Sequence, residues 1–336
     1  MAFSNADQTF KALVVSEVDG NFEQHVTERS VADLPDNEVL IEVRYSSLNY
    51  KDALSASGNK GVTRQYPHQP GIDAAGVVVE SHAEDFKPGD EVLVTGYDLG
   101  MNTDGGFGQY ISVPEEWIVR KPYQMSLKQT MMWGTAGFTA AMSAQKFLAH
   151  TELLQEGPVL VTGATGGVGS FAVSILAKEG YEVFAATGKT DQADYLKSLG
   201  ASGVIDREEV QDESGRPLLK GRWAGVVDTV GGDILSTAIR STMLEGVVTT
   251  CGNVASHTLE MNVFPFILRG VSLLGVDSAN YPMNVRQKVW QRINDDWQLP
   301  HLESMITEIG LEHLNEEIDR ILAGKQRGRI LLNLQK

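Results

Sequence analysis

Residues 159–180 read VLVTGATGGVGSFAVSILAKEG, and this stretch decides the fold. A run of β-branched and apolar residues that starts at Val159 leads into a glycine-rich turn, and an apolar stripe at helical spacing leaves it, from Val168 to Leu176. A further strand is expected at 181–186, so the pattern predicts a βαβ unit. The unpaired N–H groups at the start of such a helix favour a phosphate.

The glycines of this turn have distinct expected roles. Gly163 or Ala164 makes the turn, and Gly169 lets the helix pack against the strand. The two glycines between them let the backbone approach a pyrophosphate. The expected cofactor contacts here are Thr165, Gly166, Gly167 and Val168.

Composition limits the possible functions. The 336 residues are enough for two domains, and the net charge of −16 argues against nucleic acid and anionic membranes as partners. Cys251 is the single cysteine, which excludes an internal disulfide and a multi-cysteine zinc cluster. The chain shows no secretory leader and no long apolar stretch, so we expect a cytoplasmic protein without a membrane span.

The chain divides into a β-rich part and an alternating part. Residues 11–120 read as short strands between turns, which predicts a barrel-like β domain. A helix is expected from Ser126 to His150, and six strands with helical crossovers follow from Val159 to Val276, as in a doubly wound sheet. We expect domains at 1–127 and 128–270. Segment 271–336 then returns to complete the first domain, with the site in the cleft between the domains.

Four further stretches identify a family. They are SSLNYKD at 46–52, PGIDAAG at 70–76, GTAGFTA at 134–140 and FILRG at 266–270. With the mid-chain glycine turn they resemble the zinc-free quinone-oxidoreductase branch of the medium-chain dehydrogenase/reductase superfamily, and within it the YhdH/YhfP group, which includes acrylyl-CoA reductases. The resemblance covers nearly the whole chain. It implies a GroES-like β-barrel catalytic domain and a six-stranded parallel Rossmann domain, an α/β fold.

Two related readings are not supported by the residues. The turn also fits the TGxxxGxG pattern of short-chain dehydrogenases, but it lies mid-chain, and no tyrosine has a lysine four residues later. Zinc alcohol dehydrogenases of the superfamily resemble this chain but have a cysteine where Asn49 stands and a His-Glu pair near Ile72-Asp73. We therefore expect no metal site.

The cofactor is expected to be NADPH. An NAD-selective site places a carboxylate at the end of the second strand, where this chain has Thr187-Gly188-Lys189, a set that suits a 2′-phosphate. The family resemblance adds Arg207 as a phosphate or adenine neighbour and Arg329 as a cofactor-side contact. Thr135 is expected on the nicotinamide side. A surface position for Lys189 and both arginines is the alternative.

The expected chemistry lies in the loop Asn49–Asp52. Conjugate reduction builds negative charge on a carbonyl oxygen, which needs hydrogen-bond donors, and the α-carbon needs a proton. Asn49 and Tyr50 are the candidate catalytic residues, and Tyr50 could also stack on the nicotinamide or simply pack. Lys51 and Asp52 are expected to form an ion pair. Lys60 and Arg64 could meet a CoA phosphate or lie in a solvated loop.

These observations favour an NADPH-dependent reductase of activated C=C bonds, with acrylyl-CoA-like thioesters as the favoured substrates. The alternatives are quinone reduction and a non-enzymatic NADPH-binding sensor or regulatory subunit. The strand at Val271–Val276 is expected at the sheet edge, where it could pair with its counterpart in a homodimer.

Overall fold

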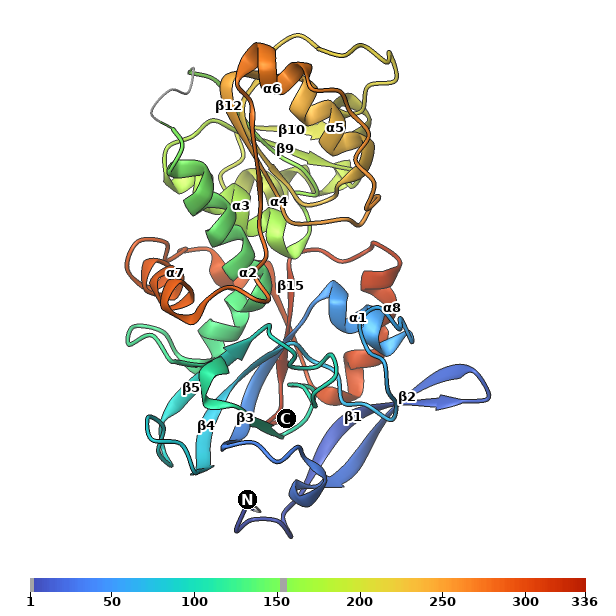
Figure 1. Cartoon of the computed structure of the whole chain (residues 1–336), viewed down its shortest axis with the longest axis vertical. Coiled ribbons are helices and arrows are strands. Elements are labelled where there is room, and N and C mark those ends of the chain that lie inside the picture. Colours follow the sequence, from blue (N-terminus) through green and yellow to red (C-terminus); the bar gives the residue numbers. More distant parts are fainter. Residues whose placement is uncertain (1–2, 152–155) are drawn as a thin grey trace. The chain divides into compact units, whose positions relative to one another are not determined.

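The computed structural model describes residues 3–151 and 156–336, which form two compact units (Figure 1). Unit 1 comprises Met1–Thr135, Ala279–Asp296 and Leu302–Lys336, and unit 2 comprises Ala136–Ser278 and Trp297–His301. No helix in the described ranges is long and apolar enough to cross a bilayer.

Unit 1 is built on a seven-stranded sheet of order β14-β15-β3-β4-β5-β7, with β6 paired to β3. A two-stranded hairpin, β1–β2, projects beside it (Figure 1). The strands are β1 (Thr9–Val18), β2 (Asn21–Ser30), β3 (Val39–Leu48), β4 (Asp73–Ser81), β5 (Glu91–Thr95), β6 (Tyr110–Val113), β7 (Ile118–Arg120), β14 (Ile306–Ile309) and β15 (Arg329–Asn333). The helices are α1 (Tyr50–Ala56), α7 (Met283–Asp295) and α8 (Leu314–Leu322).

The tail completes this unit, because β15 lies between β14 and β3 in the sheet. Ile330 pairs with Leu48 in antiparallel register, which brings the first residue of β15, Arg329, to the carboxyl end of β3. Ile330 and Leu332 of β15 join Val43 and Leu48 of β3 in one buried apolar core. Burial of this apolar surface holds the distant tail in place.

Helix α2 (Leu127–Leu148) is interrupted at Gly134, whose φ of 49° and ψ of −158° lie outside the helical region. Ser126 starts the helix with reciprocal bonds: Gln129 N–H donates to Ser126 Oγ at 3.1 Å, and Ser126 N–H donates to Gln129 Oε1 at 2.9 Å. This is the capping-box pattern expected at a helix start.

Unit 2 is a six-stranded parallel sheet of order β10-β9-β8-β11-β12-β13, flanked by its crossover helices (Figure 1). The strands are β8 (Val159–Val161), β9 (Val183–Thr187), β10 (Gly203–Asp206), β11 (Trp223–Asp228), β12 (Thr242–Thr250) and β13 (Ser272–Gly275). The helices are α3 (Gly167–Lys178), α4 (Ala193–Ser198), α5 (Gly232–Arg240) and α6 (Phe264–Arg269). The order in which strands are added to the sheet switches sides between β8 and β11, and doubly wound folds bind nucleotides at such a point. The expected fold class is confirmed.

Candidate functional site

The loop after β3 is fixed from its first residue. Asn49 lies between the end of β3 and the start of α1, and Asp52 lies in the first turn of α1. The Asp52 carboxylate accepts a 2.7 Å hydrogen bond from the Asn49 N–H and a 2.8 Å bond from the Ile72 N–H. The expected ion pair between Lys51 and Asp52 was wrong: none of the ion pairs among the described residues joins them, because Asp52 is fully buried and uses backbone donors instead.

Asp73, the first residue of β4, lies at the centre of this site with no exposed surface. Its carboxylate accepts hydrogen bonds from the Ser47 hydroxyl at 2.6 Å and from the Asn49 side-chain amide at 2.8 Å. It also accepts two from Thr135, at 2.8 Å from the N–H and 2.5 Å from the hydroxyl. A carboxylate with this many donors stays ordered.

Arg329, on β15, completes a group of contacting residues with Ser47, Asn49, Asp73 and Thr135. This group is called the Asp73 cluster below. One guanidinium nitrogen, Nη1, donates to the Leu48 carbonyl and to Asn49 Oδ1, both at 3.0 Å, and Nη2 donates to Ser47 Oγ at 2.7 Å. Nη2 also lies 3.7 Å from Asp73 Oδ2. Asn49 therefore donates to Asp73 and accepts from Arg329, so both ends of its amide are engaged.

The cluster lies directly beneath Gly134. A Cβ at this position would lie 2.4 Å from Ser47 Oγ, 2.6 Å from Asp73 Oδ2 and 2.8 Å from Arg329 Nη2. Only glycine fits this space and tolerates the positive φ. The break in α2 and the buried cluster therefore require each other.

Burial and the neighbouring Asp73 raise the pKa of Asp52 to about 7. Burial lowers the pKa of Arg329, although the two carboxylates oppose that shift. The group of two acids and one guanidinium approaches neutrality when Asp52 is protonated. Such a group is less costly to bury than a net charge.

Tyr50, the first residue of α1, differs from its neighbours. Its side chain is half-buried, and its hydroxyl has no hydrogen-bond partner in the part of the chain that the structure describes. Asn49, Thr135 and Arg329, by contrast, are all tied into the Asp73 cluster. The structure brings these three together and leaves the Tyr50 hydroxyl available.

The glycine turn in unit 2 has the geometry of an anion site. Gly163 has a φ of 59°, and a Cβ on Gly169 would lie 2.3 Å from the Gly163 carbonyl oxygen. Helix α3 follows Gly166, an N-cap residue that has no side chain to cap the helix. Gly163 in the turn and Gly166 to Val168 at the start of the helix are partly exposed. The N–H groups of this first turn therefore remain available to a phosphate.

The end of β9 lies beside this turn. The hydroxyls of Thr165 and Thr187 are 3.1 Å apart, and the Lys189 N–H donates to Thr187 Oγ1 at 3.0 Å. A Cβ on Gly188 would lie 3.0 Å from Cδ and Nε of Arg207, so the guanidinium group lies close to this backbone. Lys189 is half-buried, and burial lowers its pKa. The predicted residues 165–168, 187–189 and 207 thus belong to unit 2, and the predicted residues 49, 50, 135 and 329 to unit 1.

Sequence reasoning missed Ser47, Asp52 and Asp73 as site residues. A carboxylate inside the apolar run PGIDAAG was the available signal, because an aspartate there must be either buried with partners or functional. Lys60 is engaged elsewhere: its ammonium group lies 2.6 Å from Glu17 Oε2 and over the rings of Phe22 and Tyr66.

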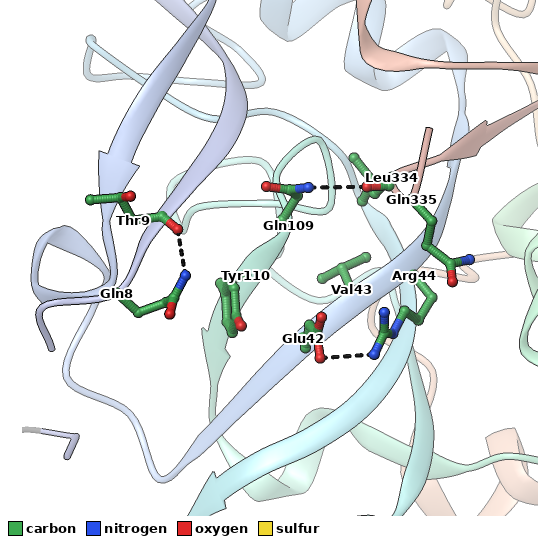
Figure 2. Close-up of a pocket in the computed structure, with 9 residues that line it drawn as sticks. All are labelled: Gln8, Thr9, Glu42, Val43, Arg44, Gln109, Tyr110, Leu334 and Gln335. Carbon is green, nitrogen blue, oxygen red and sulfur yellow. Dashed lines mark hydrogen bonds and ion pairs between the residues drawn. The ribbon is translucent and has the colours of Figure 1, made fainter. Parts of the chain in front are cut away.

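A separate cavity of about 330 Å³ lies in unit 1 (Figure 2). It contains none of the predicted site residues, and its charged groups pair with each other. Glu42 and Arg44 are 3.0 Å apart, and the Gln109 amide donates to the Leu334 carbonyl at 3.1 Å. We assign this cavity no function.

The fold and both groups of residues define a medium-chain dehydrogenase/reductase. The family "Zinc-binding dehydrogenase" matches residues 167–295, and "Alcohol dehydrogenase GroES-like domain" matches residues 35–123. Within the described residues, no group of three or more histidine, cysteine, aspartate or glutamate side chains is placed to hold a metal ion.

Three full-length relatives define the group more closely. The chain is 45% identical to the putative quinone oxidoreductase YhfP of Bacillus subtilis and 42% identical to the acrylyl-CoA reductase AcuI of Ruegeria pomeroyi, in each case over 97% of this chain and 99% of the relative. The structure of YhfP with NAD bound has a TM-score of 0.94 (44% identity, 98% of this chain and 100% of that one). YhdH of Salmonella enterica in complex with NADP has a TM-score of 0.93 (39%, 96% and 99%). The chain belongs to the YhdH/YhfP group of the medium-chain dehydrogenase/reductase superfamily.

Proposed function

We propose that this protein is an NADPH-dependent reductase of an activated C=C bond, with acrylyl-CoA-like enoyl thioesters as the favoured substrates. The observation that carries this proposal is the 42% identity to an acrylyl-CoA reductase along 97% of the chain. The similar identity to a putative quinone oxidoreductase keeps quinone reduction as the second candidate. A role as an NADPH sensor without turnover is the third.

The residues of unit 2 fit a phosphorylated dinucleotide. The uncapped start of α3 offers N–H groups to the pyrophosphate, and Thr165 to Val168 line that turn. Thr187, Gly188, Lys189 and Arg207 form a hydroxyl-bearing and cationic edge at the end of β9, whose last residue is a threonine and not an acid, and this edge suits a 2′-phosphate. When bound, NADPH supplies the hydride. The YhdH structure contains NADP and the YhfP structure contains NAD, so the assays below use both NADPH and NADH.

In unit 1, Tyr50 is the proposed catalytic donor. Its hydroxyl has no partner within the described residues, so it can donate to an oxygen on which charge develops. Asn49 and Arg329 are proposed to act through position, because their polar groups are engaged with Leu48, Ser47 and Asp73. Thr135, held by Asp73, remains the proposed nicotinamide neighbour.

The donor set of this cluster does not fit zinc. It offers an amide, hydroxyls and carboxylates beside a guanidinium, and no thiolate or imidazole, which are the ligands that zinc prefers. The Arg329 cation also faces the Asp73 carboxylate that a metal would need. We therefore propose a reaction without a metal.

A steady-state panel tests this function. Acrylyl-CoA, crotonyl-CoA, simple enones and quinones are each assayed with NADPH and NADH. The highest kcat/KM for acrylyl-CoA with NADPH supports the proposal, and a higher value for quinones favours the second candidate. Tight NADPH binding with no turnover of any of them favours the sensor.

A homodimer is part of the proposal, as is a cytoplasmic location, which a single cysteine accommodates. Strand β13 is at the end of the sheet, so one edge of its backbone is open to pairing. The residues before it are apolar and exposed, with Val263 at 61%, Ile267 at 66% and Leu268 at 59%. Light scattering should give twice the chain mass for the wild type and the monomer mass for Ile267→Glu. A wild-type monomer would overturn the dimer.

A further inference from the structure

The carboxylate of Asp228 joins the ends of three neighbouring strands in unit 2. Asp228 is the last residue of β11 and has no exposed surface. Its Oδ1 accepts a 2.8 Å hydrogen bond from the hydroxyl of Thr162, which follows β8. Its Oδ2 accepts 3.0 Å bonds from the hydroxyl of Thr250, at the end of β12, and from the Gly231 N–H.

Stability alone does not account for this carboxylate. No lysine, arginine or histidine among residues 3–151 and 156–336 pairs with Asp228, so its donors are all neutral. Burial raises the pKa of Asp228. A buried acid without a cation is costly, and an apolar residue of similar size is often no less stable. Its hydrogen bonds do fix the ends of β8 and β12 relative to the end of β11.

The contacts lead from Asp228 to the glycine turn. Thr162, which Asp228 holds, is the residue before Gly163. Thr229, which follows Asp228, donates its N–H to Thr162 Oγ1 at 3.0 Å and its hydroxyl to the Thr162 carbonyl at 2.9 Å. A Cβ on Gly163 would lie 2.3 Å from Thr229 Oγ1, so the turn packs directly against this segment.

We propose that Asp228 is a positioning residue for the dinucleotide site: through Thr162 and Thr229 it fixes the position and orientation of the glycine turn that binds the pyrophosphate. It does not touch the cofactor. This inference rests on the proposed function, because it assumes that the turn binds a dinucleotide.

The test compares two ligands that use different parts of the site. NADPH contacts both the glycine turn and the edge that binds the 2′-phosphate. 2′-AMP lacks a 5′-phosphate, so it contacts only this edge, at Thr187–Lys189 and Arg207. We expect Asp228→Asn to raise the Kd for NADPH at least fivefold, measured by calorimetry, and to leave the Kd for 2′-AMP within twofold. The KM for NADPH should rise, while kcat at saturating NADPH stays within twofold.

If Asp228→Asn fails to fold, Thr162→Val is used in its place. It removes the hydrogen bond between Thr162 and Asp228 and keeps the shape of the side chain. In the double variant the two effects should not add. Thr242→Val is the matched control: Thr242 is buried at the opposite end of β12, where its hydroxyl donates to the Ala238 carbonyl at 2.8 Å. It should lower the melting temperature and leave NADPH affinity unchanged.

Two results would overturn the proposal. One is NADPH affinity in Asp228→Asn and Thr162→Val that stays within twofold of wild type. The other is a loss of 2′-AMP affinity equal to that of NADPH, which would indicate general damage to unit 2. A wild-type protein that binds neither NADPH nor NADH would instead refute the proposed function.

Discussion

Asp73 holds Thr135 at two points: Oδ2 accepts the Thr135 N–H at 2.8 Å, and Oδ1 accepts its hydroxyl at 2.5 Å. Thr135 follows Gly134, the residue that interrupts α2. The first residue of a strand therefore fixes the residue that follows the break in a helix 62 positions later in the chain. The same carboxylate holds the Asn49 amide, so one buried acid determines the geometry of two separate segments.

The Asp73 cluster should contribute strongly to stability. Asp73→Asn leaves Arg329 buried beside a neutral amide, and this amide cannot accept all the hydrogen bonds of the carboxylate. We expect a loss of about 3 kcal/mol in the free energy of unfolding, measured with urea, because removing one partner of a buried pair leaves an uncompensated charge.

Ser55→Ala is the control in the same unit. It removes one buried hydroxyl pair, Ser55 to Thr63 at 2.7 Å, and should cost about 1 kcal/mol. An equal, small loss for Asp73→Asn would show that the cluster is not a stabilising centre.

Asp52 should make stability depend on pH in an identifiable direction. Its pKa rises from an ordinary value of 3.8 to about 7 on folding. The folded state therefore binds more protons than the unfolded state between these pH values, and this contribution to stability falls as pH rises from 4 to 7 and levels off above. This shift in the pKa corresponds to a loss of roughly 4 kcal/mol in the free energy of unfolding across that pH range.

The Asp52→Asn variant lacks this titration. Its unfolding free energy relative to wild type should therefore improve between pH 4 and pH 7 and level off above, even if its absolute value is lower at every pH. Parallel pH profiles for the two proteins would mean that Asp52 is ionised throughout. Other titrating groups cancel in the comparison.

Most of the fold was predictable because its signals are local. The βαβ unit at 159–186 and the strands of unit 2 appear at the expected places. Strand β2 (Asn21–Ser30) has a weak local signal, because its sequence, NFEQHVTERS, is mostly polar and the hairpin buries little of it. Strand β14 has no local signal of its own, because the pairing with β15 is what makes these four residues a strand.

The cluster in unit 1 was less predictable because it depends on long-range contacts. Arg329 meets Asn49 across 280 positions of the sequence, and no local pattern reports that distance. The same holds for Asp228 and Thr162, which are 66 positions apart. Residue types at a site can be inferred from the sequence, whereas their partners follow from strand order.

Activity should survive removal of metal ions. The described side chains that bond to Asn49 include no thiolate or imidazole, and the Arg329 guanidinium lies beside Asp73. Extended treatment with a chelator, followed by assay in metal-free buffer, should leave kcat/KM unchanged. Activity that disappears and returns with added zinc would show that a metal is required.

Lys189 should discriminate between the two nicotinamide cofactors. Lys189→Ala removes a half-buried cation from the edge formed by Thr187 and Arg207, and a contact of this kind with the 2′-phosphate contributes on the order of 1 kcal/mol. The KM for NADPH should rise roughly fivefold, while NADH kinetics change little. Lys197→Ala, an exposed lysine in α4, is the control and should affect neither. Equal losses with both cofactors would rule out recognition of the 2′-phosphate.

Tyr50 should act through its hydroxyl, and the effect should depend on the substrate. A thioester enolate needs charge stabilisation and then a proton on carbon, whereas a reduced quinone gives an oxyanion that water protonates readily. Removal of a neutral donor near developing charge costs about 1–3 kcal/mol, or roughly 5- to 150-fold in rate. Tyr50→Phe should therefore lower kcat for acrylyl-CoA far more than for a quinone.

The ring remains in Tyr50→Phe, so NADPH affinity should hardly change, and Tyr123→Phe, which alters a tyrosine that is 74% exposed, should have no effect on either substrate. Tyr50→Ala separates the hydroxyl from the ring, because it removes both. If Tyr50→Phe is kinetically silent while Tyr50→Ala weakens NADPH binding, the residue is a packing and stacking surface. The proton must then come from water or from another side chain. Asp52 would be the next group to test, because its pKa of about 7 allows it to hold a proton at neutral pH.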